Sequence, residues 1–395
     1  MHLLKGKEPS TPQKMQSLLL KLSPESALAL PLAASLVFNA LLLLALLHRC
    51  SSKAPRATKP ATAQALSPKP AQRPKKQTRQ PPDVSDPVAA VEKLRALNAD
   101  FKYLEAGELL DALQLALSGD GHGSSATWSI GAQWSKDEAR QQLNELLNSS
   151  SLEERISTAR AAVKDLNNDQ GFDLIQEDPT MKVLQRLTPD RVLTVKIEAV
   201  LEGVSPAQCI MIWREAALYP EWFPFVTGGK TLGDIHPGDT IVHILVETFF
   251  MSVDMVLWGW ACDNLSEGEL LMCVRPVRSS TKRPPGVPYP PPGGGARRQT
   301  VFGALRAHAV IDILVEPLGD RSVRFAFQMS DQLPSFMPSW AINYVVQNAM
   351  VDIFRKMSEV ATQMAKGDPA SKHLQHINRP AYAPTREWIE ERLGK

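Results

Sequence analysis

The side chains best suited to metal chemistry lie in one short segment. His236 and His243, together with Asp234 and Asp239, are residue types that bind Zn²⁺. Their spacing places His243 within an alternating, strand-like stretch and His236 in the loop before it, so a shared ion would need unusual geometry. The four cysteines of the chain contain no CxxC pair that would supply further ligands. We therefore predict no metal site.

Motifs that carry catalysis are missing from the chain. It contains no GxSxG nucleophile motif, no HExxH zinc motif, no GxxxxGK[ST] phosphate loop and no dinucleotide-binding fingerprint. We therefore predict no catalytic residue and no cofactor, and we expect that the protein is not an enzyme.

An apolar segment near the N-terminus predicts a membrane anchor. After a tail of residues 1–26, residues 27–47 form a charge-free apolar run, and about 20 helical residues cross a hydrocarbon core about 30 Å thick. Nine basic residues and no acidic residue lie between His48 and Pro82, so the positive-inside rule places the C-terminal part in the cytoplasm. A transit sequence for a plastid or mitochondrion and a cleaved signal peptide are the alternatives.

Residues 48–86 predict a basic, disordered linker. The stretch is rich in Pro, Ala, Lys and Gln and carries almost no large apolar side chain, so burial cannot offset the entropy of ordering. Its cations should be attracted to anionic headgroups by about 1 kcal/mol each near the surface, unless the linker is merely solvated. Cys50 is a candidate for palmitoylation. No aromatic residues interleave with the cations, so we expect no nucleic-acid partner.

Residues 87–170 predict four helices. Asp86 is an N-cap candidate, and Pro87 stands at the first helical position. Residues 104–117 carry leucines on one helix face, as in a helix hairpin or in a helix that binds a protein partner. The region therefore predicts either a small helical unit or a docking surface for another protein.

Beyond residue 171 the pattern changes to the alternation that is typical of strands. Residues 192–203 alternate, and a helix capped by Ser205 follows. Gly, Asn, Asp or Pro separates four further strand segments at hairpin-like spacing: residues 239–263, 269–277, 304–317 and 320–331. Residues 342–364 then place apolar side chains at the spacing of one long amphipathic helix. The predicted fold class is α+β, with a curved antiparallel sheet that closes around the final helix.

Four short motifs follow one another along this region. They are YPEW at residues 219–222, RSS at 278–280, LRA at 305–307, and DQLP at 331–334 followed by WAIN at 340–343. In this order they resemble the motifs of the START domain, the StAR-related lipid-transfer module with a helix-grip fold. The resemblance covers residues 171–366. The chain departs from the family at Gln332, where a glycine is missing, and by a long insertion around Lys282. Residues 367–395 form a C-terminal tail with a short helix, whose Trp388 is expected to dock on the body.

The resemblance implies a lipid-holding cavity between the sheet and the final helix. The residues around 249–260 are apolar on both faces of their strand, and only one face can meet ordinary solvent. We expect a cavity of a few hundred Å³ with a few polar groups that fix a headgroup. The candidate lipid-binding residues are Phe249, Met251, Val253, Met255, Leu257, Arg275, Arg306, Trp340, Tyr344, Val345, Asn348 and Ala349.

The leading hypothesis is a membrane-anchored protein that binds or transfers a lipid or a sterol-like ligand. The first alternative is a membrane-tethered interaction scaffold or lipid sensor without transfer activity. The second is a helix-grip enzyme of the cyclase or hydrolase kind.

Overall fold

The computed structural model describes residues 81–118, 130–236, 238–247, 252–265, 268–278, 290, 304–319, 321–333, 342 and 345–392. The predicted membrane helix at residues 27–47 and the linker up to residue 80 lie outside these ranges. Within the ranges, no helix combines the length and the apolar content needed to cross a bilayer. The membrane anchor therefore stays a prediction.

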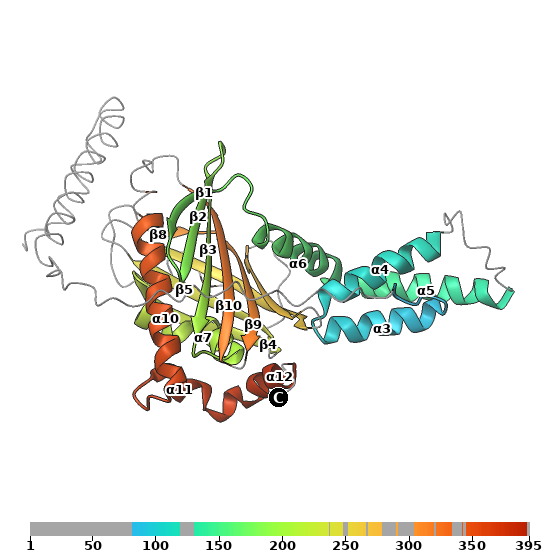
Figure 1. Cartoon of the computed structure of the whole chain (residues 1–395). Coiled ribbons are helices and arrows are strands. Elements are labelled where there is room, and N and C mark those ends of the chain that lie inside the picture. The colour runs from blue at the N-terminus through green and yellow to red at the C-terminus, as the bar shows by residue number, and fades with distance from the viewer. Residues whose placement is uncertain are drawn as a thin grey trace, which may run out of the picture. The chain divides into compact units, whose positions relative to one another are not determined.

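Four helices form the first described region, as the sequence predicts for residues 87–170 (Figure 1). They are α3 (Pro87–Ala99), α4 (Tyr103–Ser118), α5 (Ile130–Ser149) and α6 (Leu152–Leu166). The Asp86 carboxylate caps α3 by accepting hydrogen bonds from the backbone N–H groups of Val88 and Ala89. Four leucines of α4 are buried, namely Leu109, Leu110, Leu113 and Leu117. The leucine face of α4 is therefore packed within the protein.

A sheet of ten strands follows within the described residues. Its strands are β1 (Asp173–Glu177), β2 (Met181–Leu187), β3 (Val192–Glu202), β4 (Val226–His236), β5 (Asp239–Glu247), β6 (Ser252–Asn264), β7 (Glu269–Pro276), β8 (Ala304–Arg306), β9 (Val310–Gly319) and β10 (Ser322–Gln332). They are ordered β1-β2-β3-β10-β9-β7-β6-β5-β4 with antiparallel neighbours. The short β8 pairs in parallel with the first residues of β6. The predicted α+β class with an antiparallel sheet is confirmed.

Strand β4 is absent from the sequence prediction because its residues show no apolar alternation. Its sequence, VTGGKTLGDIH, carries three glycines. At Gly229 a Cβ atom would lie 1.9 Å from the carbonyl oxygen of Ala216. Only glycine permits this close approach between β4 and the 3-10 turn η1 (Ala216–Leu218). The glycine that weakens the strand pattern in the sequence is therefore required for the packing of β4.

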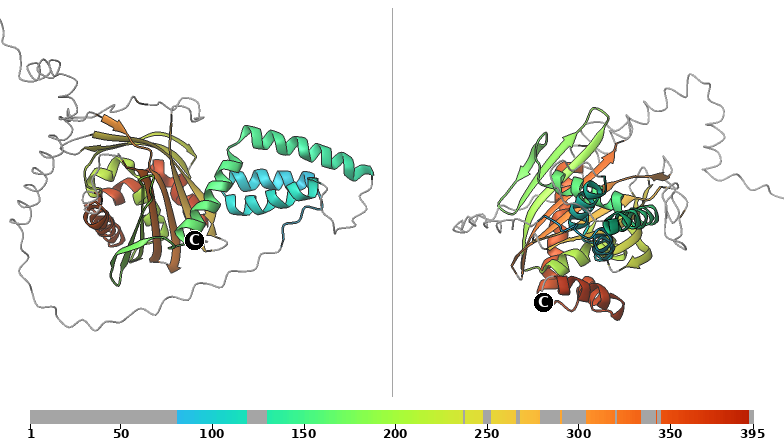
Figure 2. Two further views of the ribbon diagram at one scale, coloured as in Figure 1. Left: turned by 90° about the horizontal axis from the view of Figure 1, so that it is seen from above. Right: turned by 90° about the vertical axis from the view of Figure 1, so that its right-hand side faces the viewer.

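Helices on the concave side of the sheet cover one of its faces (Figure 2). These are α7 (Pro206–Arg214), the short α8 (Tyr219–Trp222) and α10 (Val351–Ala365). Ser205 caps α7 as predicted, in a reciprocal capping box with Gln208. The chain then continues through α11 (Lys372–Ile377), the 3-10 turn η4 (Pro380–Tyr382) and α12 (Ala383–Arg392).

The long C-terminal helix uses its apolar stripe as core. It begins as a π-helix, η3 (Val345–Met350), and continues as α10. The buried members of the stripe are Ile342, Val346, Met350, Ile353, Phe354, Met357, Ala361 and Met364. The ring of Phe354 lies 6.1 Å from that of Phe325 on β10. The described part of this stripe therefore packs against the sheet, within the inner core.

A second core lies on the opposite, convex face, between the sheet and the helices α3 to α6. The sheet contributes Trp260, Cys262, Leu271, Cys273, Leu314 and Ala326 to it. Successive strand residues point to opposite faces, so these strands are apolar on both sides. α6 and part of α4 thus cover the second apolar face, whereas α3 and α5 pack mainly on the other helices and project away from the sheet (Figure 1).

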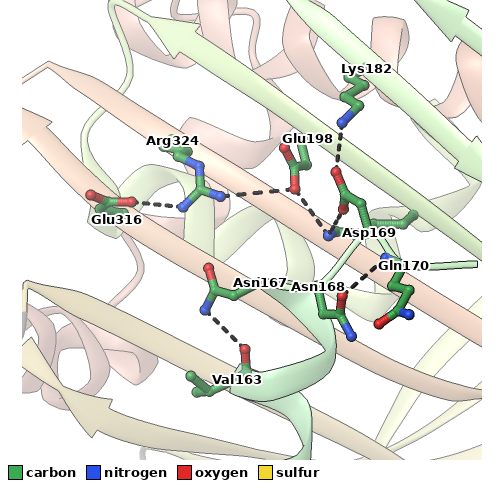
Figure 3. Close-up of polar contacts among 10 residues, drawn as sticks. Val163, Asn167, Asn168, Asp169, Gln170, Lys182, Glu198, Glu316 and Arg324 are labelled. Carbon is green, nitrogen blue, oxygen red and sulfur yellow. Dashed lines mark hydrogen bonds and ion pairs between the residues drawn. The ribbon is translucent and has the colours of Figure 1, made fainter. Parts of the chain in front are cut away.

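Ion pairs hold the connection between α6 and β1 on this outer face (Figure 3). The Asp169 carboxylate accepts a hydrogen bond from Lys182 at 2.6 Å and another from the fully buried Lys196. Lys196 also pairs with Glu198 at 3.1 Å, and Arg324 lies 3.9 Å from the same Glu198. The connection is thereby fixed to β2, β3 and β10. Since both carboxylate oxygens of Asp169 accept from lysines, this cluster reads as a structural contact.

Candidate functional site

An apolar cavity of about 120 Å³ lies between the concave face of the sheet and the helices α7 and α8. Its described lining residues are Ile210, Trp213, Arg214, Tyr219, Phe223, Val226, Gly238, Thr240, Val242, Ile244, Met255, Leu257, Gly259, Trp260, Ala261, Met272, Val274, Ile311, Ile313, Met329, Thr385 and Trp388. Strands β5, β6, β7 and β9 supply alternate residues, as expected for one face of a sheet. The cavity therefore occupies the interior of the grip.

The cavity is smaller than the sequence-based expectation of a few hundred Å³. Sites for drug-sized ligands measure about 300–1,000 Å³. A lipid chain would therefore fit only after part of the wall has moved.

Two of the predicted lipid-binding residues line this cavity. Met255 and Leu257 point into it from β6. Val253, on the same face of β6, is partly buried but lies outside the described lining. Four predicted residues lie outside the described ranges: Phe249, Met251, Trp340 and Tyr344. Three others belong to η3, and the structure describes only the backbone of these three: Val345, Asn348 and Ala349.

The two predicted arginines are not among the described residues that line the cavity. Arg275 follows the lining residue Val274 and so points to the other face, where its guanidinium pairs with Asp312 at 2.7 Å. Burial raises the pKa of that Asp312 carboxyl. Arg306 lies at the end of β8 and binds the fully buried Asp254 through two hydrogen bonds, of 2.9 and 2.6 Å.

The Arg306 and Asp254 pair extends to His243 on the same outer face. The Nε2 atom of His243 lies 3.3 Å from the Asp254 carboxylate. Burial lowers the pKa of His243, which favours the neutral ring. His243 belongs to the strand segment in which the sequence places it, and within the described residues no group of three potential metal ligands comes together.

Several residues of the cavity wall were not among the predicted site residues. Trp213, on α7, and Tyr219 and Phe223, around α8, belong to the aromatic part of the wall. The Tyr219 hydroxyl donates a hydrogen bond to the Trp213 carbonyl, and burial raises its pKa. The indole N–H groups of Trp213 and Trp260 are buried without a hydrogen-bond partner in the described part of the chain. Only the YPEW motif pointed to this side of the cavity.

One end of the cavity is formed where three distant segments meet. Thr240 and Gly259 are register partners near one end of β5 and β6, and Gly238 lies in the turn before them. From outside, the Phe101 ring approaches this turn, since a Cβ atom at Gly238 would lie 3.6 Å from it. Trp388 of α12 lines the same end and meets the Phe101 ring edge-on, with 5.8 Å between centroids.

An ion pair fixes the outer helices beside this end of the cavity. Arg155 of α6 binds Asp239 at 2.6 Å, and its guanidinium lies 5.4–5.5 Å from the ring centroids of Trp258, Trp260 and Tyr103. Both charged side chains are nearly buried, with 12% and 5% of their surfaces exposed. The Trp258 indole also donates to Asp239. The helical layer is therefore attached to the strand that begins the cavity wall.

Known proteins resemble this chain in structure but not detectably in sequence. No family model matches it, and no curated protein matches it. The structure of a STAR-related lipid transfer protein from Xanthomonas axonopodis matches 49% of this chain over its full length, at 16% identity and a TM-score of 0.39. The structure of human STARD10 matches 59% of this chain over 85% of its own length, at 13% identity and a TM-score of 0.44. The Zhui aromatase/cyclase from a Streptomyces species matches 44% of this chain over 95% of its own length, at 11% identity and a TM-score of 0.30.

Solved structures of START and StAR-related lipid transfer domains therefore match about half of the chain.

Proposed function

We propose that this protein binds a hydrophobic ligand, a lipid or a sterol-like molecule, in the cavity of its helix grip. The observation that carries the proposal is a wall made almost wholly of apolar side chains around an internal space. A hydrophobic ligand in this space would remove its own apolar surface and that of the wall from water, which favours binding.

The chemistry of the wall favours binding over catalysis. Among the described lining residues, Arg214 is the single charged side chain, and no Asp, Glu, His or Lys is present. Proton transfer in such a cavity would lack a carboxylate or imidazole of suitable pKa. The likeness to an aromatase/cyclase concerns the fold, so the enzyme reading remains the weaker alternative.

The alternative of an interaction scaffold loses part of its basis. It relied on a free leucine face in residues 104–117, whereas four of these leucines lie in the outer core. Leu115, with 61% of its surface exposed, remains available on α4. A protein partner for the helical layer would thus have to use mainly polar contacts.

Ligand binding is tested with the purified full chain. Mass spectrometry of an organic extract identifies co-purified lipid, and an NBD-labelled fatty acid reports binding by fluorescence after delipidation. Val274→Phe, which fills the cavity, should weaken probe binding by about tenfold or more. Val200→Phe is the matched control, because Val200 is 40% exposed on β3. A wild-type chain that carries no lipid and binds no apolar probe would overturn the proposal.

We further propose that residues 27–47 anchor the protein in a membrane with the folded part on the cytoplasmic side. Two glycosylation sequons begin at Asn148 and Asn264. Asn264 is buried and donates to Glu269, whereas Asn148 is exposed on α5, so only Asn148 can report on the compartment. Retention of the chain in carbonate-washed membranes supports the anchor. An endoglycosidase shift that Asn148→Gln abolishes would place the folded part on the lumenal side.

A further inference from the structure

The C-terminal helix α12 contributes part of the cavity wall. Thr385 and Trp388 line it, although they lie more than 50 residues beyond Met329, the preceding lining residue in the described chain. Thr385 has 3% of its surface exposed. The rest of the wall comes from sheet strands, from α7 and α8, and from the turns joined to them.

The attachment of α12 differs from that of every strand in the wall. Strands are held by continuous backbone ladders, such as the nine register pairs between β5 and β6. The segment that carries α12 branches off after Gly367, which ends the long C-terminal helix in a left-handed conformation at φ 68°. Ile377 of this segment belongs to the inner core, and Leu374, Tyr382 and Trp388 pack against that core. The ring of Phe101 lies 5.8 Å from that of Trp388. Displacing α12 would break no backbone ladder of the sheet.

Side-chain hydrogen bonds add to this attachment. The Tyr382 hydroxyl donates to the buried Glu215 carboxylate at 2.8 Å, next to the start of α12. Lys372 of α11 pairs with Glu221 at 2.6 Å, but both side chains are about half exposed, so this pair contributes little. Arg386 donates to the Ile377 carbonyl at 2.6 Å and so joins α12 to α11. His376 also lies 3.4 Å from the Glu215 carboxylate. The segment from α11 to α12 is therefore joined to the body by side-chain contacts and not by a backbone ladder.

We propose that this C-terminal segment is a removable end wall of the ligand cavity, and that Trp388 determines how long a ligand can be. This inference rests on the proposed function. At about 120 Å³ the cavity is smaller than the sites of drug-sized ligands, so a long acyl chain would need part of the wall to move. α7, α8 and α12 are the wall elements outside the sheet, and α12 is the one that follows the branch after Gly367. With Trp388 in place, the cavity ends against the Phe101 ring.

The test uses the full chain with Trp388→Phe and Trp388→Ala, and NBD-labelled fatty acids with short, medium and long acyl chains. Association rates are measured by stopped-flow fluorescence. For the longest probe, Trp388→Ala should raise the association rate by about tenfold, which corresponds to 1.4 kcal/mol in the barrier. Trp388→Phe should fall in between, and the preference for short over long probes should shrink in the same order. Glu387→Ala, on the exposed side of α12, is the control and should leave the rates unchanged.

A second variant separates movement of the wall from its shape. Tyr382→Phe removes the hydrogen bond to Glu215 but keeps the ring, so it should speed the entry of all probes without changing the preference for length. If the wild type binds the probes and Trp388→Ala shows the same association rates and the same length preference, the end-wall role is overturned and the proposed function still stands. A lack of probe binding by wild type and variants alike would overturn the proposed function, and this inference with it.

Discussion

The two faces of the central strands have similar composition but different packing. On the convex face, Leu271, Cys273 and Leu314 belong to the core that the sheet shares with the helices α3 to α6. On the concave face of the same strands, Met272, Ile313 and their neighbours border a space of about 120 Å³. Apolar side chains on a strand therefore do not reveal whether a face is filled. What decides is the shape of the element that covers it.

The two faces also differ in charge. The convex face carries buried ion pairs, with Arg155 on Asp239 and Arg306 on Asp254. The described cavity wall has Arg214 as its charged member. Paired charges fix the orientation of the helical layer, whereas an apolar wall without fixed partners is compatible with ligands of varied shape.

The largest effect is expected from breaking the ion pair on the convex face. Asp239→Ala leaves the Arg155 guanidinium buried without its carboxylate and should cost about 3–5 kcal/mol in the free energy of unfolding. Urea denaturation measures this loss. The matched control is Asp111→Ala, because Arg160 and Asp111 pair at the same 2.6 Å distance but are 42% and 61% exposed. That change should cost less than about 1 kcal/mol. Equal losses would show that buried charge does not fix the helical layer.

Neighbouring residues of β7 allow the packing of the two faces to be compared directly. Leu271 is fully buried under the helices, and Leu271→Ala should cost about 3–5 kcal/mol, because it opens a new cavity. Met272 already borders the existing cavity, so Met272→Ala should cost only about 1–2 kcal/mol. Chemical denaturation of both variants gives the difference. A larger loss for Met272 would mean that the concave face is the better packed.

Acid should weaken the concave side through His373 of α11. Burial, with a smaller contribution from His376, lowers the pKa of His373 from 6.5 to about 4. The unfolded chain then binds more protons between these values, so stability is lost as the pH falls from about 6.5 towards 4. Between pH 7 and pH 5 the loss should be about 2 kcal/mol. Urea midpoints at both pH values measure it, and His373→Leu should lack this part of the loss. A pH dependence that is unchanged in His373→Leu would contradict the assignment.

The smallest effect is expected for the buried thiols, which lie on both sides of the sheet. Burial raises the pKa of Cys209, in the inner core, and of Cys262, in the outer core, to about 12. Cys273 is shifted in the same direction by burial. At pH 8 these three thiols should remain unlabelled by iodoacetamide over an hour, as read by peptide mass spectrometry. Labelling of Cys209 alone would show that the concave side opens more readily.

Sequence patterns predicted the elements whose signals are local. The Ser205 cap, the alternation of β3 and the stripe of the last helix each depend on residues within one element. Successive residues of a strand point to opposite faces of the sheet. Once Val274 is known to face the cavity, its neighbour Arg275 is therefore expected on the other face.

Other features of the site depend on residues that are distant in sequence. The volume of the cavity results from rotamers on β5 to β9, α7 and α12 together, and no local pattern encodes it. β4 was missed because its glycines serve the close contact with Ala216. Trp388 was expected to dock on the body, yet an isolated aromatic residue does not reveal what it covers. The membrane anchor at residues 27–47 stays a prediction.

The outer core has a consequence for biosynthesis. Its helical half, up to Leu166, leaves the ribosome before the strands that it covers, and the last of these contributes Ala326. At about 5–20 residues per second, the helices wait roughly 10 to 30 seconds for their partner surface. During that interval the apolar surface that α4 and α6 present to the sheet is exposed to the cell, so nascent chains of this protein should be bound by a chaperone that shields such surface.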